Sequence, residues 1–326
     1  MRINQAEKME IIRIVEHSPV GAKRTLKELQ INRSTFYNWY GKYIKGGYDG
    51  LADKTPRRKG YWNRIPQEIR QQVVTVALDM PERSSREIAM FYTDHYRYHI
   101  SESSVYRILK KRGLIAAAVY TVQPAADEFR DKTTRINEMW QTDFTYLKVL
   151  GHWGWYYLST ILDDYSRYIV AWRLCKNMKR QDVEDTVTDA LATYDIPREN
   201  RPRLLSDNGS CYIAGKLKGF LKVRGIDQVH GAPFHPQTQG KIERYHRSMK
   251  IVLLQDNYFS PQDLEKEIKV WVNYYNNQRY HESLNNLTPA DIYFGRAEQR
   301  LRERAQIKHQ TMEERRRIYQ QQKLVS

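Results

Sequence analysis

Cysteine is scarce in this chain of 326 residues, in which Cys175 and Cys211 are the two cysteines. Two cysteines are too few for a disulfide framework. Their separation also lacks the CxxC spacing that is typical of a zinc knuckle. We therefore do not expect cysteine chemistry at the centre of the function.

Long apolar runs are also missing. No run approaches the roughly 18 residues that a membrane-spanning helix needs, and the mean hydropathy is −0.77. The first ten residues are polar and charged, without the apolar stretch of a secretory signal. The sequence therefore predicts a protein that has no membrane partner and stays in the cytoplasm.

Acidic residues are outnumbered: 38 Asp and Glu stand against 54 Lys and Arg, which gives a net charge of +16. By residue counts, segments 1–115, 116–290 and 291–326 carry net charges of +10, +2 and +4. A strongly basic segment is the electrostatic signature of a polyanion-binding protein. We expect the N-terminal third to bind nucleic acid through its phosphates, with an affinity that falls as salt rises.

Residues 1–50 predict a helix-turn-helix DNA-binding domain. The apolar spacing between Glu7 and Val15 indicates one helix, Leu26 and Leu29 mark a second, and Asn32 is suited to capping a third. In such domains the last helix reads the major groove. Its exposed candidates for DNA contact are Arg33, Ser34, Thr35, Tyr37 and Asn38.

The helical pattern repeats after a basic linker at residues 51–64. In the repeat, residues 65–115, Ser84 and Ser101 are placed to cap helices and Gly113 to end the last one. We interpret this segment as a second helix-turn-helix domain; two helical bundles without a ligand are the alternative. The candidate DNA contacts of the linker and of the last helix are Arg57, Arg58, Lys59, Ser103, Ser104, Arg107, Lys110 and Lys111.

A second linker at 116–135 leads to a different pattern. Segments 139–150, 152–162 and 168–174 are rich in aromatic and β-branched residues and predict an antiparallel three-stranded meander. Helices and short strands then alternate, which indicates a mixed sheet flanked by helices. We assign residues 136–290 to this α/β domain and residues 291–326 to a basic C-terminal helix or tail, whose arginines could bind DNA or a neighbouring subunit.

Three carboxylates stand where chemistry is expected. Asp143 lies inside a strand, where a buried charge needs a partner or a metal. Asp207 directly follows the strand 203–206, and ligand sites of α/β sheets gather at such strand ends. Glu243 opens a helix and shares one face with Arg247 and Lys250. Taken singly, each carboxylate could equally be a solvated surface group.

The motifs around these acids resemble bacterial insertion-sequence transposases with a retroviral-integrase core, the DDE recombinases. WQTDFTY, LLSDNGS and FHPQTQGKIERYHRSMK occur in the family's order, and 35 residues separate Asp207 from Glu243. Lys250, seven residues after Glu243, occupies a basic position typical of the family. The resemblance implies an RNase H-like fold in which Asp143, Asp207 and Glu243 are the catalytic metal ligands.

The resemblance also implies a cofactor, partners and a reaction. Two Mg²⁺ (or Mn²⁺) ions would be held by the three acids, because hard oxygen ligands suit these cations. Water would free a 3′-hydroxyl at a transposon end, and that hydroxyl would attack target DNA. The partners would be double-stranded DNA, as terminal inverted repeats and as target, and at least a second copy of the chain in the bacterial nucleoid.

Alternatives remain open for several residues. Arg247 and Lys250 would hold the DNA backbone, although an exposed basic face is an equal reading for Arg247. Gln239 could contact DNA or support a loop. Asp163 and Asp164 have the composition of a hairpin turn, and we expect no catalytic role for them. The competing functions for the whole chain are a DNA-binding regulator and a nuclease that cleaves without joining.

Overall fold

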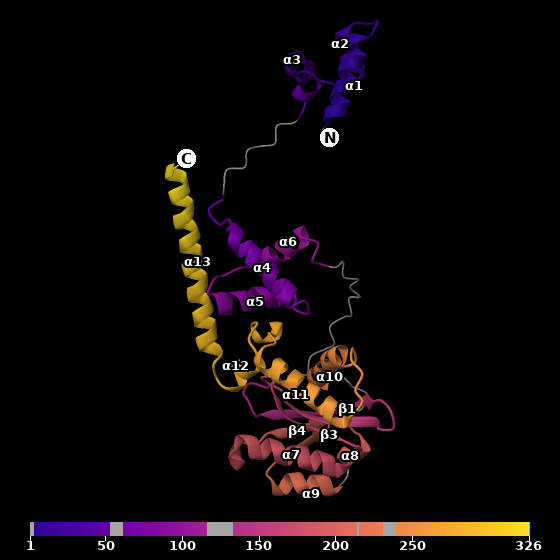
Figure 1. The fold of residues 1–326 in the computed structure, drawn as a ribbon, viewed down its shortest axis with the longest axis vertical. Coiled ribbons are helices and arrows are strands. Elements are labelled where there is room, and N and C mark those ends of the chain that lie inside the picture. The colour runs from indigo at the N-terminus through magenta and orange to yellow at the C-terminus, as the bar shows by residue number, and fades with distance from the viewer. Residues whose placement is uncertain (1–2, 53–60, 116–132, 214, 231–238, 326) are drawn as a thin grey trace. The chain divides into compact units, whose positions relative to one another are not determined.

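The computed structural model describes residues 3–52, 61–115, 133–213, 215–230 and 239–325, and it divides into two compact units at Tyr61 and Trp62. Figure 1 labels the helices and strands of both units. None of the helices in these ranges is long and apolar enough to cross a membrane.

The first unit is a three-helix domain made of α1 (Gln5–Glu16), α2 (Ala22–Glu28) and α3 (Arg33–Gly50). Ile12, Leu26 and Phe36 bury their side chains at its centre. The Asn32 side chain accepts a hydrogen bond from the Ser34 backbone N–H at 3.0 Å, as expected of the cap of α3. The sequence pattern predicts a third helix from Arg33 to about Tyr43. Helix α3 extends beyond Tyr43, because helical geometry breaks only at residues 46 and 47.

The second unit starts with another three-helix group: α4 (Gln67–Asp79), α5 (Ser85–Tyr96) and α6 (Glu102–Lys111). Ser84 caps α5 through a capping box with Glu87. Ser101 occupies the N-cap position of α6, but its hydroxyl contacts Ser104 Oγ at 2.9 Å. Tyr92, which is buried, lies in the core of this group.

A five-stranded sheet forms the centre of the second unit, in the order β3-β2-β1-β4-β5. Its strands are β1 (Met139–Val149), β2 (Gly154–Asp163), β3 (Ile169–Cys175), β4 (Arg203–Ser206) and β5 (Gln228–His230). Strands β1, β2 and β3 pair antiparallel, whereas β4 pairs parallel with β1 and β5 parallel with β4. The predicted mixed sheet behind a helical N-terminal region is confirmed.

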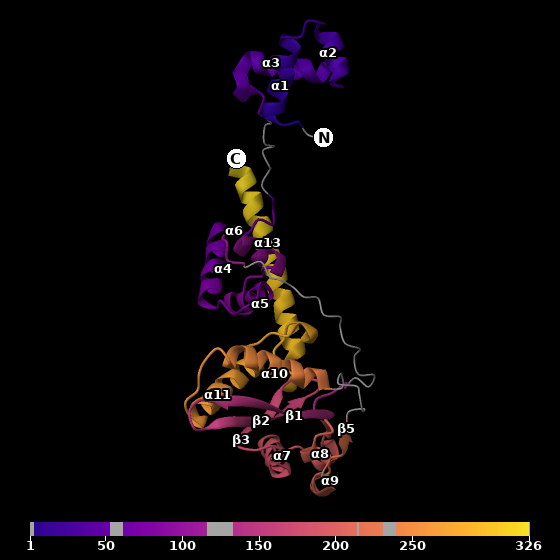
Figure 2. The ribbon, with the colours of Figure 1, turned by 90° about the vertical axis from the view of Figure 1, so that its right-hand side faces the viewer.

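Helices cover both faces of the sheet, as Figures 1 and 2 show. One face carries α7 (Arg180–Tyr194), α8 (Ser210–Ile213) and α9 (Gly215–Val223), and Trp140 and Leu204 are buried there. The other face carries α10 (Gly240–Leu253) and α11 (Pro261–Asn277), and Leu147 is buried there. The three- and four-residue spacing of Tyr245, Met249 and Val252 predicts a buried apolar stripe on α10. The structure corrects this, because Val252 is exposed and Leu253 is buried.

The C-terminal segment contains α12 (Pro289–Tyr293) and the long helix α13 (Ala297–Val325), which contacts the α4–α6 group. The Arg304 guanidinium donates to both oxygens of Asp94 at 2.7 Å. Arg315 donates to the Tyr98 hydroxyl and to the His99 carbonyl, each at 2.8 Å. These two arginines were expected to offer a basic surface. They are instead used inside the chain, because the polar groups of the α5–α6 segment need partners when α13 covers them.

Candidate active site

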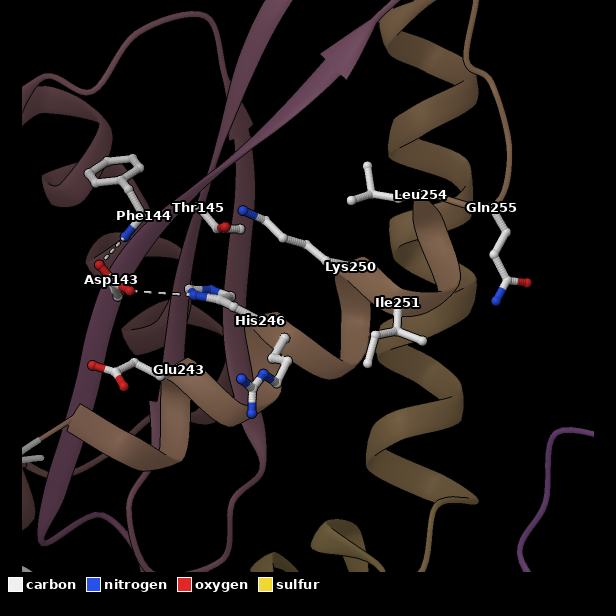
Figure 3. A pocket seen from close by; sticks show the side chains of 10 residues that line it. Asp143, Phe144, Thr145, Glu243, His246, Lys250, Ile251, Leu254 and Gln255 are labelled. Atoms are coloured by element: carbon white, nitrogen blue, oxygen red, sulfur yellow. Dashed lines mark hydrogen bonds and ion pairs between the residues drawn. The ribbon is translucent and has the colours of Figure 1, made fainter. Parts of the chain in front are cut away.

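A pocket of about 670 Å³ lies between β1 and α10 and contains two of the three predicted carboxylates, Asp143 and Glu243 (Figure 3). The face of α10 that the sequence identified, with its carboxylate followed by two cations, lines this pocket. Its lining residues are Asp143, Phe144, Thr145, Glu243, His246, Arg247, Lys250, Ile251, Leu254 and Gln255.

Asp143 projects from β1 toward α10 and is held on both sides. Its Oδ1 accepts a hydrogen bond from the Phe144 backbone N–H at 2.8 Å, and its Oδ2 lies 3.4 Å from Nδ1 of the buried His246. The other ring nitrogen, Nε2, lies 3.2 Å from Thr160 Oγ1. Because a carboxylate only accepts, Nδ1 carries the hydrogen that faces Asp143. Sequence reasoning gave His246 no role, since nothing local links it to β1.

Glu243 lies in the first turn of α10, where the helix dipole favours a negative charge. Burial raises the pKa of the Glu243 carboxyl, and the negative charge of Asp143 raises it further. Two carboxylates that repel each other in one pocket are the environment that a bound cation would relieve. The donor set is made of hard oxygens, which fits Mg²⁺ or Mn²⁺.

Asp207 directly follows β4, the strand that pairs in parallel with β1. Gln141 of β1 is paired with Leu205 of β4 in parallel, and Asp143 and Asp207 each follow two residues later. The Asp207 side chain is exposed, and its Oδ1 accepts from the Gly209 backbone N–H at 2.9 Å. A Cβ at position 209 would lie 3.0 Å from that oxygen, so glycine leaves room for this turn.

Tyr212 links the two aspartates electrostatically. The pKa of this fully buried phenol is raised well above its usual value, first by burial and next by the charge of Asp143, with a smaller effect of Asp207. Both carboxylates therefore lie within electrostatic range of one hydroxyl.

The three acids do not form a closed ligand cage. Within the five described ranges, no group of three or more His, Cys, Asp or Glu side chains is arranged to hold a metal ion. The structure brings Asp143 and Glu243 into one pocket, and Asp207 directly follows the adjacent strand β4, outside the lining. Their joint role as ligands stays a prediction.

Lys250 and Arg247 both line the pocket, as their positions on α10 suggested. The Lys250 ammonium lies 3.9 Å from the ring centroid of Tyr146, a cation–π contact that directs the side chain across β1. Gln239 is buried, and its amide donates to the backbone oxygens of Thr142 and Leu205 at 3.3 Å each. Of the two readings of Gln239, this contact favours the supporting one.

The predicted DNA contacts of the helical segments lie on exposed helix faces where they are described. All five candidates on α3 are exposed, and Phe36 of the same helix is buried. On α6, Ser104 is partly buried and the other four candidates are exposed; Arg107 Nε donates to the Ser103 carbonyl at 2.9 Å. The linker candidates Arg57, Arg58 and Lys59 lie outside the described residues.

Asp163 and Asp164 are both buried, although their sequence suggested an ordinary turn. Asp163 accepts from Ser166 and from the Asn137 backbone. Asp164 accepts from Thr133, Gln141 and the ammonium of Lys241. These contacts occupy both carboxylates within the protein, which agrees with the expectation that neither is catalytic.

Family comparisons match the same parts of the chain. A model described as an integrase core domain matches residues 133–236, and a second model with that description matches residues 224–289. A homeodomain-like domain model matches residues 35–109.

Several relatives are insertion-sequence transposases. The chain is 27% identical over 165 residues to the transposase for insertion sequence element IS904 of Lactococcus lactis, which covers 49% of this chain and 63% of that protein. The chain is 24% identical over 267 residues to the putative transposase InsK for element IS150 of Escherichia coli. This matched region covers 82% of this chain and 91% of that protein. With the IS629 transposase of Shigella sonnei the match spans about half the length of the relative.

Among solved structures, the HTLV-2 integrase catalytic core domain in complex with magnesium is 18% identical, with a TM-score of 0.38 over 49% of this chain and 97% of that one.

These findings define an integrase-core protein: a helix-turn-helix region followed by the α/β core of the DDE-type enzymes. Over these regions the chain is similar to insertion-sequence transposases that carry this core.

Proposed function

We propose that the chain binds the terminal inverted repeats of its own element, cleaves there to free 3′-hydroxyls, and joins them to target DNA by Mg²⁺-dependent transesterification. The observation that carries the proposal is the pocket between β1 and α10. It holds two mutually repelling carboxylates, Asp143 and Glu243, and the cations Arg247 and Lys250 line the same pocket.

Asp143, Asp207 and Glu243 would hold the divalent ions, two per site. When bound, such ions activate an attacking oxygen and offset charge on the leaving oxygen. Asp207 would reach the ions from the end of β4, the strand that pairs in parallel with β1. His246 keeps the Asp143 carboxylate turned toward α10 through the contact at 3.4 Å.

The reaction needs two in-line displacements at phosphorus. In the first, the oxygen of water bonds to phosphorus, the bond to the 3′-oxygen breaks, and that oxygen takes up a proton. In the second, the freed 3′-hydroxyl attacks a target phosphodiester and displaces the target's own 3′-oxygen, so the number of phosphodiester bonds is unchanged. Lys250 and Arg247 would hold the DNA backbone during both displacements.

The helical segments would supply DNA recognition. We place a helix-turn-helix domain at residues 1–50 and a second one at 65–115, joined by the basic segment 51–64, ahead of the core at 136–290 and the C-terminal helix. The exposed candidates on α3 and α6 suit phosphate oxygens and base edges. Because two transposon ends must be brought together, we propose at least a dimer on DNA.

The test uses labelled DNA that carries the element's terminal repeat, a target duplex, and Mg²⁺. We expect 3′-end cleavage and strand-transfer products, both abolished by EDTA and by Glu243→Gln, while Glu243→Gln still binds the DNA. Cleavage without joining would favour the nuclease. If the wild type bound the DNA but gave no product, and Asp143→Asn bound it equally well, the result would favour the DNA-binding regulator.

A further inference from the structure

Helix α10 begins with backbone N–H groups that need acceptors, as every helix does. Gln239 occupies its N-cap position but uses its amide on Thr142 and Leu205. The Ile242 N–H in the same turn donates instead to Oε1 of Gln141 at 3.0 Å. Gln141 comes from β1, about a hundred residues earlier in the chain, and is 1% exposed. It therefore acts as an N-cap supplied by the sheet.

Asp164 fixes which way the Gln141 amide points. The Gln141 Nε2 donates to Asp164 Oδ1 at 2.7 Å. A carboxylate can only accept, so the NH₂ end must face Asp164 and the oxygen must face Ile242. Asp164 also receives the Lys241 ammonium at 2.6 Å and the Thr133 hydroxyl at 2.6 Å. Asp164 is 3% exposed. It holds the first turn of α10 at two neighbouring residues: at Lys241 directly, and at Ile242 through Gln141.

The Gln141–Ile242 hydrogen bond joins the two elements that carry the pocket carboxylates, next to both of them. Gln141 precedes Asp143 by two residues on β1, and Ile242 directly precedes Glu243 on α10. This hydrogen bond, together with the contacts of Gln239 with Thr142 and of His246 with Asp143, ties the start of α10 to the strand that carries Asp143. Divalent cations tolerate little error in the spacing of their ligands, Mg²⁺ least of all, because it requires near-octahedral oxygens.

We infer that Gln141 and Asp164 are positioning residues for the catalytic site: Asp164 orients the Gln141 amide, and Gln141 holds the first turn of α10, which carries Glu243, against the strand that carries Asp143. The inference rests on the proposed function. Partners of this kind, one step behind the ligands, commonly change metal affinity by about 10- to 100-fold when they are lost.

The test measures Mn²⁺ binding to the whole chain by electron paramagnetic resonance, without DNA, beside thermal unfolding. The variants are Gln141→Met, which keeps the size and removes the acceptor, and Asp164→Asn, which lets the Gln141 amide turn over. Their controls are Gln181→Met, which removes an exposed Gln–Asp bond of 2.9 Å to Asp185, and Asp189→Asn, which removes an exposed ion pair of 2.7 Å to Arg173.

We expect the dissociation constant for Mn²⁺ to rise about tenfold or more in both test variants and to stay at the wild-type value in both controls. The half-activating Mg²⁺ concentration for DNA cleavage should rise in parallel, with cleavage returning at high Mg²⁺. A loss of thermal stability with unchanged Mn²⁺ affinity would overturn the inference, because it would show a purely structural role. A wild type that neither binds Mn²⁺ nor cleaves would instead refute the proposed function.

Discussion

The largely buried ion pair between α5 and α13 gives a prediction whose size follows from the structure. Arg304 and Asp94 are 11% and 13% exposed and share two hydrogen bonds of 2.7 Å. Arg304→Met keeps the apolar stem but leaves Asp94 with the Tyr280 hydroxyl, which donates to it at 3.0 Å. Removing one partner of a buried pair costs about 3–5 kcal/mol. Since some solvent reaches this pair, we expect the lower end, about 3 kcal/mol.

Thermal and urea unfolding followed by circular dichroism measure this loss. For a unit of this size, about 3 kcal/mol corresponds to a fall in Tm of roughly 6–12 °C. Adding Asp94→Asn to Arg304→Met should cost much less than the sum of the two single changes, because both remove the same contact.

Arg302→Met is the matched control on the same helix. Arg302 pairs with Glu298 at 2.8 Å, but the two side chains are 77% and 83% exposed. Exposed pairs contribute about 0–1 kcal/mol, so this variant should unfold almost as the wild type does. Equal losses in Arg302→Met and Arg304→Met would refute the reasoning, because burial would then not set the cost.

Three further predictions concern other residues. His281, whose Nε2 has no hydrogen-bond partner among the described residues, has a pKa lowered to about 3 by burial and then by Arg279; it stays neutral when folded and takes up a proton on unfolding below pH 6.5. The free energy of unfolding should therefore fall as the pH drops from 6.5 to 3, by about 1–2 kcal/mol at pH 5. His281→Phe should flatten this part of a plot of urea midpoint against pH. A profile that stays unchanged in the variant would contradict the assignment. Lys250→Ala should weaken DNA binding and reduce the salt slope by about one, whereas the exposed Lys222→Ala should leave the slope unchanged; equal slopes in a filter-binding titration would place the DNA elsewhere. Ser84→Ala should cost about 1 kcal/mol because it breaks a capping box, and Ser101→Ala less, because its hydroxyl contacts only Ser104 in the described structure; chemical denaturation that ranks them in reverse would refute the capping geometry.

Local signals predicted much of the fold. Strand β4 has the bounds 203–206 that the sequence indicated, because a short apolar run ends there at a polar turn. The caps at Asn32 and Ser84 are also as expected, since capping depends on residues two or three positions apart. The burial of Leu253 in place of Val252 was missed, because a slight change in the orientation of α10 decides which of two adjacent apolar residues faces the sheet.

The candidate site was only partly readable from sequence. The grouping of Glu243, Arg247 and Lys250 on one face follows from helical spacing, and the pocket lining agrees with it. The contacts of His246 with Asp143, and of Gln141 with Ile242, join segments about a hundred residues apart. Such contacts depend on how α10 packs on β1, which no local pattern encodes.

The surroundings of Asp164 show the same limit. Its neighbours Tyr165 and Ser166 have the composition of a turn, which gave no indication that the Asp164 carboxylate is buried. Asp164 is buried because Lys241 and Gln141 supply its partners from other elements. The local sequence pattern predicts the turn, but it cannot predict the partners that Lys241 and Gln141 supply.

Asp207 provides the most direct test of the account, because its side chain lies outside the pocket lining while the proposed chemistry requires it. The measurement compares 3′-end cleavage and strand transfer by Asp207→Asn and by Asp189→Asn, on terminal-repeat DNA with Mg²⁺. We predict that Asp207→Asn loses both products by about a thousandfold, equivalent to about 4 kcal/mol of transition-state stabilisation, while DNA binding is retained. If Asp207→Asn were as active as Asp189→Asn, a site built on three carboxylates would be contradicted.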